Sequence, residues 1–247
     1  MGKIIAFPGS DPDRLPKADS QSSEQLDYSP FEHSRWWRLG RDILRCAASS
    51  GLRLTESGAL PDILARRLVQ AHIQPDQEGP QRGIAGPAQA NEVERCLEML
   101  ELLKLVKSRK GWLSCTRLGK RHAENPDQLY PPLFDLVMTG QNWQADSPVS
   151  HNLLTRFQEM APQSLAFLEQ FCQDWFSAGS LVDLAQDQLF LDETDAGEAW
   201  YTISVRNYFE PLGLVNLRCL RGDLRRWSLR DDEIKITALF DHFLGKS

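Results

Sequence analysis

Long apolar runs are missing from this sequence. No stretch of it approaches the roughly 20 apolar residues that a membrane-spanning helix requires. Residues 1–8 contain a single lysine and a short apolar stretch, which falls below the roughly 7–15 apolar residues of a secretory signal. Ala6 also stands where a myristoylation motif has Ser or Thr. We therefore expect a cytoplasmic protein with no membrane partner.

Cysteine is scarce and poorly spaced for metal binding or redox chemistry. The cysteines are odd in number and widely separated, and they include no C-x-x-C pair. Metal and redox sites use closely spaced ligands, so we interpret these residues as buried free thiols in a reducing compartment. They are Cys46, Cys96, Cys115, Cys172 and Cys219.

The motifs of common catalytic sites are also absent. There is no phosphate loop of the G-x-G-x-x-G or Walker type, no G-x-S-x-G and no H-E-x-x-H. The histidines are scattered, and the acidic clusters at 192–195 and 231–233 are typical of solvated loops. We expect no catalytic residue, cofactor or metal, although an enzyme whose site is assembled from distant residues stays open.

Charge, by contrast, is distributed unevenly. The formal net charge is −6, a sign that opposes general attraction to nucleic acid. Residues 31–123, however, carry 16 basic and 10 acidic side chains, whereas residues 124–247 carry 9 and 19. A basic first half joined to an acidic second half predicts two distinct interaction surfaces.

Two segments concentrate the positive charge. Residues 104–121 contain seven basic side chains and no acidic one, and residues 218–230 contain five against Asp223 alone. A single run of this kind is typical of a solvated face, but two runs at matching places in a repeat favour a function. The candidate nucleic-acid-binding residues are Lys104, Lys107, Arg109, Lys110, Arg117, Lys120, Arg121, Arg221, Arg225 and Arg226.

The pattern along the chain predicts three parts. Residues 1–30 are rich in Pro, Ser, Asp and Gln and lack periodicity, which indicates a flexible leader. Residues 31–124 form a basic first domain, and residues 125–247 form a helical second domain that is acidic overall. Apolar periodicity predicts helices over residues 35–49, 61–72, 90–103, 118–123, 127–137, 151–160, 164–176 and 196–210.

A short unit recurs in both halves. Residues 103–106 (LKLV) match residues 212–215 (LGLV), and each follows an amphipathic helix and leads into a basic segment. The copies close on residues 113–116 (LSCT) and 234–237 (IKIT), and residues 52–55 (LRLT) supply a partial third copy of the closing element. In each copy the Thr is placed to cap the next helix.

This repeat predicts a mainly α fold with tandem winged-helix-like units and short β-hairpins. A helix that turns into a hairpin with a basic tip is the helix–hairpin part of a winged helix. The alternative is any helix followed by a hairpin, because the motif is short.

These motifs resemble a loosely defined set of uncharacterised bacterial winged-helix-like proteins, some of which carry SEC-C motifs. The similarity lies in Leu54-Thr55 through Gly58 to Leu60-Pro61, then in Leu105-Val106 and in residues 113–119. It spans about residues 35–140 and, more weakly, 196–244. The resemblance implies a helical, winged-helix-like fold and no known activity. The Cys/His cluster of a SEC-C metal site is absent, so the resemblance implies no metal.

Two functions follow from these observations. In the first, the protein is a non-catalytic regulator that holds DNA phosphates with its basic wing turns. The helix over residues 90–103 opposes a major-groove pose, since it carries four glutamates against Arg95. Binding led by the wings, or by Arg66 and Arg67, therefore stays open. In the second, the same module binds a protein partner or a second copy of itself through opposite charges.

Overall fold

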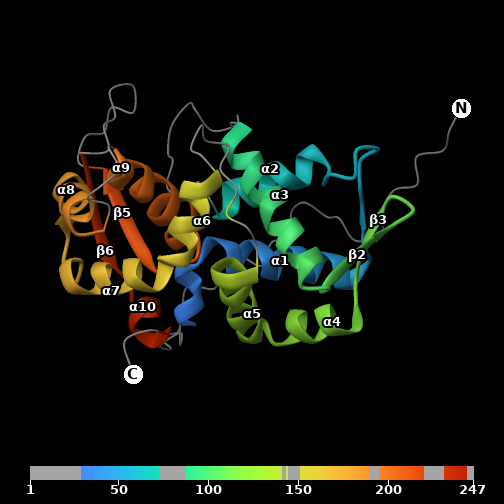
Figure 1. Ribbon diagram of the computed structural model, residues 1–247. Coiled ribbons are helices and arrows are strands. Elements are labelled where there is room, and N and C mark those ends of the chain that lie inside the picture. The colour runs from blue at the N-terminus through green and yellow to red at the C-terminus, as the bar shows by residue number, and fades with distance from the viewer. Residues whose placement is uncertain are drawn as a thin grey trace, which may run out of the picture.

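The chain is mainly helical and carries two small antiparallel sheets, as the predicted fold class requires at this level (Figure 1). The computed structural model describes residues 29–72, 87–140, 143, 151–189, 195–219 and 231–243. The predicted leader lies outside these residues apart from its last two positions. Within the described residues, no helix is both long enough and apolar enough to cross a bilayer.

The first unit, residues 35–115, is built from three helices and a three-stranded sheet. Helix α1 (Arg35–Ser49) leads into strand β1 (Leu52–Arg53), followed by helices α2 (Asp62–His72) and α3 (Pro87–Leu102). Strands β2 (Val106–Arg109) and β3 (Trp112–Cys115) then form a hairpin. The antiparallel strand order is β1-β3-β2, so β3 is central. Helix α4 (Arg117–Glu124) follows directly.

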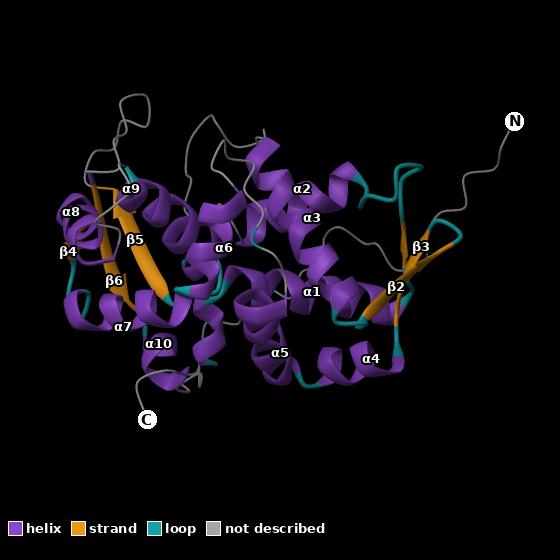
Figure 2. Cartoon of the chain, viewed as in Figure 1, coloured by secondary structure: helices purple, strands orange, loops and turns teal. Residues whose placement is uncertain are grey.

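The second unit, residues 161–236, repeats this order of elements. Helix α7 (Ala161–Phe171) precedes strand β4 (Phe176–Ser177), helix α8 (Ala178–Leu189), and helix α9 (Ala196–Trp200), which continues as the π-helix η4 (Tyr201–Phe209). Strands β5 (Val215–Cys219) and β6 (Asp232–Ile236) complete a sheet of order β4-β6-β5, and helix α10 (Ala238–Phe243) follows. The two sheets lie at opposite ends of the molecule (Figure 2).

One of the remaining described elements precedes the first unit, and the others lie between the two units in the sequence. The turn η1 (Pro30–His33) precedes α1. After α4 come η2 (Pro126–Leu129), α5 (Tyr130–Asp135), the π-turn η3 (Leu136–Gly140) and α6 (His151–Glu159). The helix predicted over residues 127–137 is therefore present as three consecutive helical segments.

Local chemistry explains where α1 begins and ends. The Ser34 hydroxyl accepts a hydrogen bond from the Trp37 backbone N–H at 3.1 Å, which satisfies one of the free donors of the first turn. Gly51 has a positive φ of 71°, which suits the residue that ends a helix. The helix predicted over residues 35–49 is confirmed.

The repeated sequence motif forms the same turn in both units. Leu105 N–H donates to the Leu100 carbonyl and Leu214 N–H donates to the Phe209 carbonyl, so both helices end with the same hydrogen bond. The turn residue has positive φ in each copy, at Lys104 and Gly213.

The closing Thr of each copy returns to that turn. Thr116 donates its side-chain O–H to the Lys104 carbonyl at 2.8 Å, and Thr237 donates to the Gly213 carbonyl at 2.6 Å. Each hydroxyl also accepts from the first turn of the next helix, as predicted.

Two expectations about individual elements are wrong, and one helix was not predicted. Residues 52–55 are not a third closing element, because Leu52 pairs with Leu113 as the first strand of the sheet. The helix predicted to reach Phe176 ends at Phe171, where the Cys172 carbonyl accepts from Ile236 N–H, and Phe176 belongs to β4 instead. Helix α8 has no counterpart among the predicted helices.

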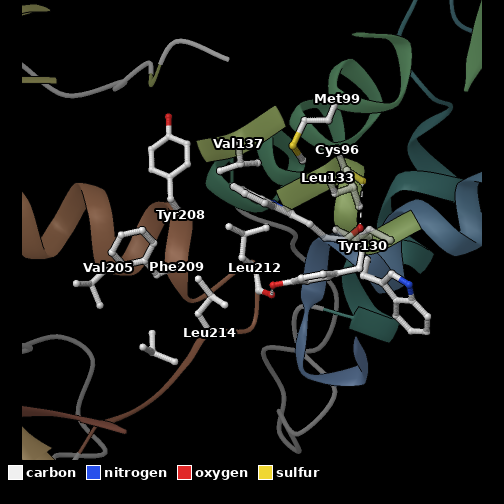
Figure 3. Close-up of a cluster of buried hydrophobic side chains, with 14 of the residues drawn as sticks. Cys96, Met99, Tyr130, Leu133, Val137, Val205, Tyr208, Phe209, Leu212 and Leu214 are labelled. Carbon is white, nitrogen blue, oxygen red and sulfur yellow. Dashed lines mark hydrogen bonds between the residues drawn. The ribbon is translucent and has the colours of Figure 1, made fainter. Parts of the chain in front are cut away.

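A continuous apolar core joins the two units. Figure 3 shows side chains of α3 and α5 facing those of η4 and the turn after it. Trp143 stacks on Tyr208 with ring centroids 4.3 Å apart, and Trp36 meets the same ring edge-on. The Tyr130 hydroxyl donates to the Leu212 carbonyl at 3.1 Å. The start of α1 therefore packs directly against the second unit.

Candidate nucleic-acid interface

The tip of the first hairpin is a tight turn that presents a lysine. Lys110 and Gly111 both have positive φ, at 53° and 74°, between the last residue of β2 and the first of β3. Two positive-φ residues form a type I′ turn, whose twist matches that of the flanking strands. The hairpin predicted from the sequence is therefore present, and its tip points away from the second unit (Figure 1).

Helix α4 lies at the same end of the molecule as this hairpin (Figure 2). Gly119 allows α4 to pack closely against the backbone at Leu105, because a β-carbon at position 119 would overlap the Leu105 carbonyl oxygen. The cap at Thr116 sets the direction of the helix.

All seven basic side chains predicted in this segment are exposed, and we call them the basic end. Within the described part of the chain, none of them forms an ion pair with a carboxylate. Two lie on β2, two on the adjoining turns and three on α4. They are Lys104, Lys107, Arg109, Lys110, Arg117, Lys120 and Arg121.

The second group of predicted residues, Arg221, Arg225 and Arg226, lies outside the described residues, and its role stays a prediction. The strand before it is described. There Arg218 donates from Nε to Glu233 Oε2 at 2.5 Å, and its guanidinium lies 4.2 Å from the centre of the Trp175 ring. This arginine is therefore neutralised within the fold.

One basic residue of the site was missed by the sequence reasoning. Arg53 is paired with Trp112, which is paired on its other side with Arg109. Residues paired across antiparallel strands point to the same face of a sheet, so these three side chains form one row. All three are exposed, whereas Leu113 on the opposite face is fully buried. The apolar alternation of residues 52–55 is typical of a strand, but no local signal indicates which strand it pairs with.

The helix before the hairpin turns an acidic face to solvent. Glu94, Glu98 and Glu101 are exposed on α3. Arg95, the one basic residue among them, lies over the Tyr208 ring at 5.5 Å from its centre. This surface would repel phosphates if α3 entered a major groove.

A second charged cluster lies where the two units meet. Arg35 Nη2 lies 3.2 Å from Glu92 Oε1 and 2.5 Å from Glu210 Oε2. Together with Arg206 these residues line a polar hollow of about 310 Å³. Burial raises the pKa of both Glu92 and Glu210, and Arg35 opposes that rise. The cluster balances its own charge, so we interpret it as a structural link between the units.

Burial disfavours the thiolate form of the cysteines whose side chains the structure describes. Burial raises the pKa of Cys96, of Cys115 and of Cys172, the last to about 12, so these buried thiols stay protonated. His72 Nε2 lies 2.9 Å from Asp42 Oδ2. Burial and the negative charge of Asp42 raise the pKa of Cys46. No group of three His, Cys, Asp or Glu side chains suited to a metal ion occurs there.

Comparison with protein-family models, curated proteins and solved structures finds no significant match to this chain.

Proposed function

We propose that this chain is a non-catalytic nucleic-acid-binding or regulatory protein that contacts phosphates with the basic end of its first unit. The observation that carries the proposal is a set of seven exposed cations that meet no carboxylate in the described structure. Exposed lysines and arginines of this kind bind phosphates by releasing counterions from the nucleic acid.

We also propose that both units are winged-helix-like. Support comes from the shared order of helix, strand, two helices and hairpin, and from the central position of the last strand in each sheet. In that arrangement β2 and β3 are the wing of the first unit. Because α3 presents glutamates, the wing and α4 make the contacts and α3 stays out of the groove.

A binding assay tests this proposal. We expect the protein to bind a labelled 20-base-pair duplex at 50 mM salt, measured by fluorescence anisotropy, and to lose affinity as salt increases. Each phosphate contact contributes about −0.9 to the slope of log affinity against log salt. Replacing Arg109→Glu with Lys110→Glu should therefore reduce the slope by roughly 2 and weaken binding at least about tenfold.

The matched control changes the same amount of charge elsewhere. Arg66 and Arg67 are exposed on α2, and Arg66→Glu with Arg67→Glu should leave the slope near that of the wild type. A larger loss from this pair than from the hairpin pair would move the interface to α2. A wild-type protein that binds neither this duplex nor a single strand of the same length at low salt would refute the proposal.

The alternative function is binding to a protein or to a second copy of the chain. The specific observation in its favour is that the exposed glutamates of α3 belong to the same unit as the basic end, so two copies offer complementary charges. Sedimentation of the same samples separates the two functions. Self-association that disappears at high salt, without duplex binding, would support this alternative.

A further inference from the structure

The outer face of the first sheet carries an aromatic ring between two cations. Trp112 lies on the central strand β3, with Arg53 paired to it from β1 and Arg109 paired to it from β2. Neighbouring strands are about 4.8 Å apart, so the two arginines flank Trp112, one on each side of the central strand. Lys107 lies on the same face of β2, since it is two residues from Arg109.

The Trp112 ring is available to a ligand. Its side chain is 48% exposed, which makes it one of four large apolar side chains exposed in the described residues. Within those residues its ring makes no stacking or cation contact, although several other tryptophans do. A tryptophan that only stabilised the sheet would be expected to bury its ring against the core.

In the second unit, the equivalent row of side chains forms an ion pair within the fold. The equivalent positions are Ser177, Glu233 and Arg218, in the same register. There the central residue is an acid that binds the arginine at 2.5 Å, and Trp175 covers that arginine. The first unit replaces the acid by an exposed tryptophan and adds a second cation. Only the first unit therefore offers an unneutralised row.

We propose that this row is a stacking platform for a single-stranded nucleic acid. Trp112 stacks on an unpaired base, and Arg53 and Arg109 hold the phosphates on either side of it. This inference rests on the proposed nucleic-acid function and names its ligand class. Sites for single strands combine a positive surface that follows the backbone with aromatic rings on which bases stack.

Charge and base accessibility favour a single strand over a duplex. The cations attract phosphates, and a flat ring on a sheet reaches a base face only where that base is unstacked. In a duplex the base faces are covered by their neighbours, and the acidic α3 opposes entry into the groove. DNA and RNA share the required base and phosphate, so both belong to the proposed class.

The test compares ligands that differ only in their bases. We expect the wild-type protein to bind a 15-nucleotide oligothymidylate, or the matching oligouridylate, more tightly than an abasic 15-mer with the same phosphates. Trp112→Leu keeps an apolar side chain without a stacking ring. Because stacking contributes about 1–3 kcal/mol per base, this variant should lose roughly 5- to 150-fold in affinity for the thymidylate. Its affinity for the abasic strand should stay within about twofold.

One further variant and one folding control make the result decisive. Trp112→Phe keeps a ring and should recover most of the thymidylate affinity, and a far-ultraviolet circular dichroism spectrum that matches the wild type would show that the leucine variant is folded. If Trp112→Leu binds the oligothymidylate and the abasic strand with the same affinities as the wild type, the stacking platform is wrong. If Trp112→Leu weakens duplex binding as much as it weakens thymidylate binding, the assignment to a single strand is wrong.

The proposal that the basic end binds phosphates is tested separately from the stacking platform. If Arg109→Glu with Lys110→Glu abolishes salt-dependent binding while Trp112→Leu changes nothing, the basic end binds nucleic acid and the stacking platform is wrong. If the wild-type protein binds none of these strands and no duplex, both proposals are wrong. A preference for uridylate over thymidylate would identify RNA as the source of the ligand.

Discussion

Removing the positive charge of Arg35 should destabilise the junction between the two units. This arginine bridges Glu92 on α3 and Glu210 after η4, and all three side chains are only 20–24% exposed. The substitution Arg35→Met keeps most of the aliphatic stem and removes the charge. It leaves two largely buried carboxylates that repel one another, without the cation that separates them.

The magnitude and its pH dependence follow from this arrangement. Breaking a buried ion pair from one side typically costs about 3–5 kcal/mol, and we expect about 2–4 kcal/mol at pH 7 because some solvent reaches these groups. Burial raises the pKa of Glu92 and Glu210, and loss of Arg35 raises it further. A carboxyl group with a raised pKa stabilises the folded state when protonated, so the cost should be full at pH 7 and smaller at pH 5.

Urea unfolding of the wild type and the variant at both pH values measures this difference. The double variant Arg35→Met with Glu210→Gln serves as the control, because it removes one of the uncompensated carboxylates. It should recover about half or more of the stability lost at pH 7. An equal loss at pH 5 and pH 7, without recovery in the double variant, would show that the stem of Arg35 stabilises the fold and its charge does not.

Two further predictions concern the repeated turn. Thr237 is buried and hydrogen-bonded to the Gly213 carbonyl and to the start of α10, so Thr237→Val should cost about 2 kcal/mol in urea unfolding. Thr116→Val, at a half-buried site, should cost less, and the reverse order would contradict this reasoning. Gly213→Ala should cost at least about 3 kcal/mol, because its β-carbon would lie 2.5 Å from His33 and Ser34 backbone atoms. Lys104→Gly should be neutral or stabilising by up to about 1 kcal/mol, and thermal unfolding compares this pair.

Local signals were sufficient for most of the helices and for the first hairpin. Ser34 and Gly51 mark the ends of α1, and the apolar spacing of residues 93–103 marks α3. These features depend on hydrogen bonds and side chains within a few residues of one another, which is the range that a sequence pattern reports. The repeated turn and its capping Thr were predictable for the same reason.

Contacts between distant segments were not predictable in this way. The apolar stripe of residues 165–176 continues without a break, but α7 ends because the Cys172 carbonyl accepts from Ile236 N–H in β6. Arg53 joined the candidate site only through its pairing with Trp112, a partner 59 positions away. The candidate residues 221–226 lie outside the described structure and stay as the sequence predicts them.

The gathering of positive charge at residues 104–121 and the motif shared by the two halves can be read from residue order alone, because composition and spacing carry that information directly. Which charges are neutralised depends on the folded chain, because ion pairing requires atoms that the fold brings within a few ångströms of one another. The fold joined Arg35 to Glu92 and Glu210 and Arg218 to Glu233. It left Arg53, Trp112 and Arg109 together on an open face.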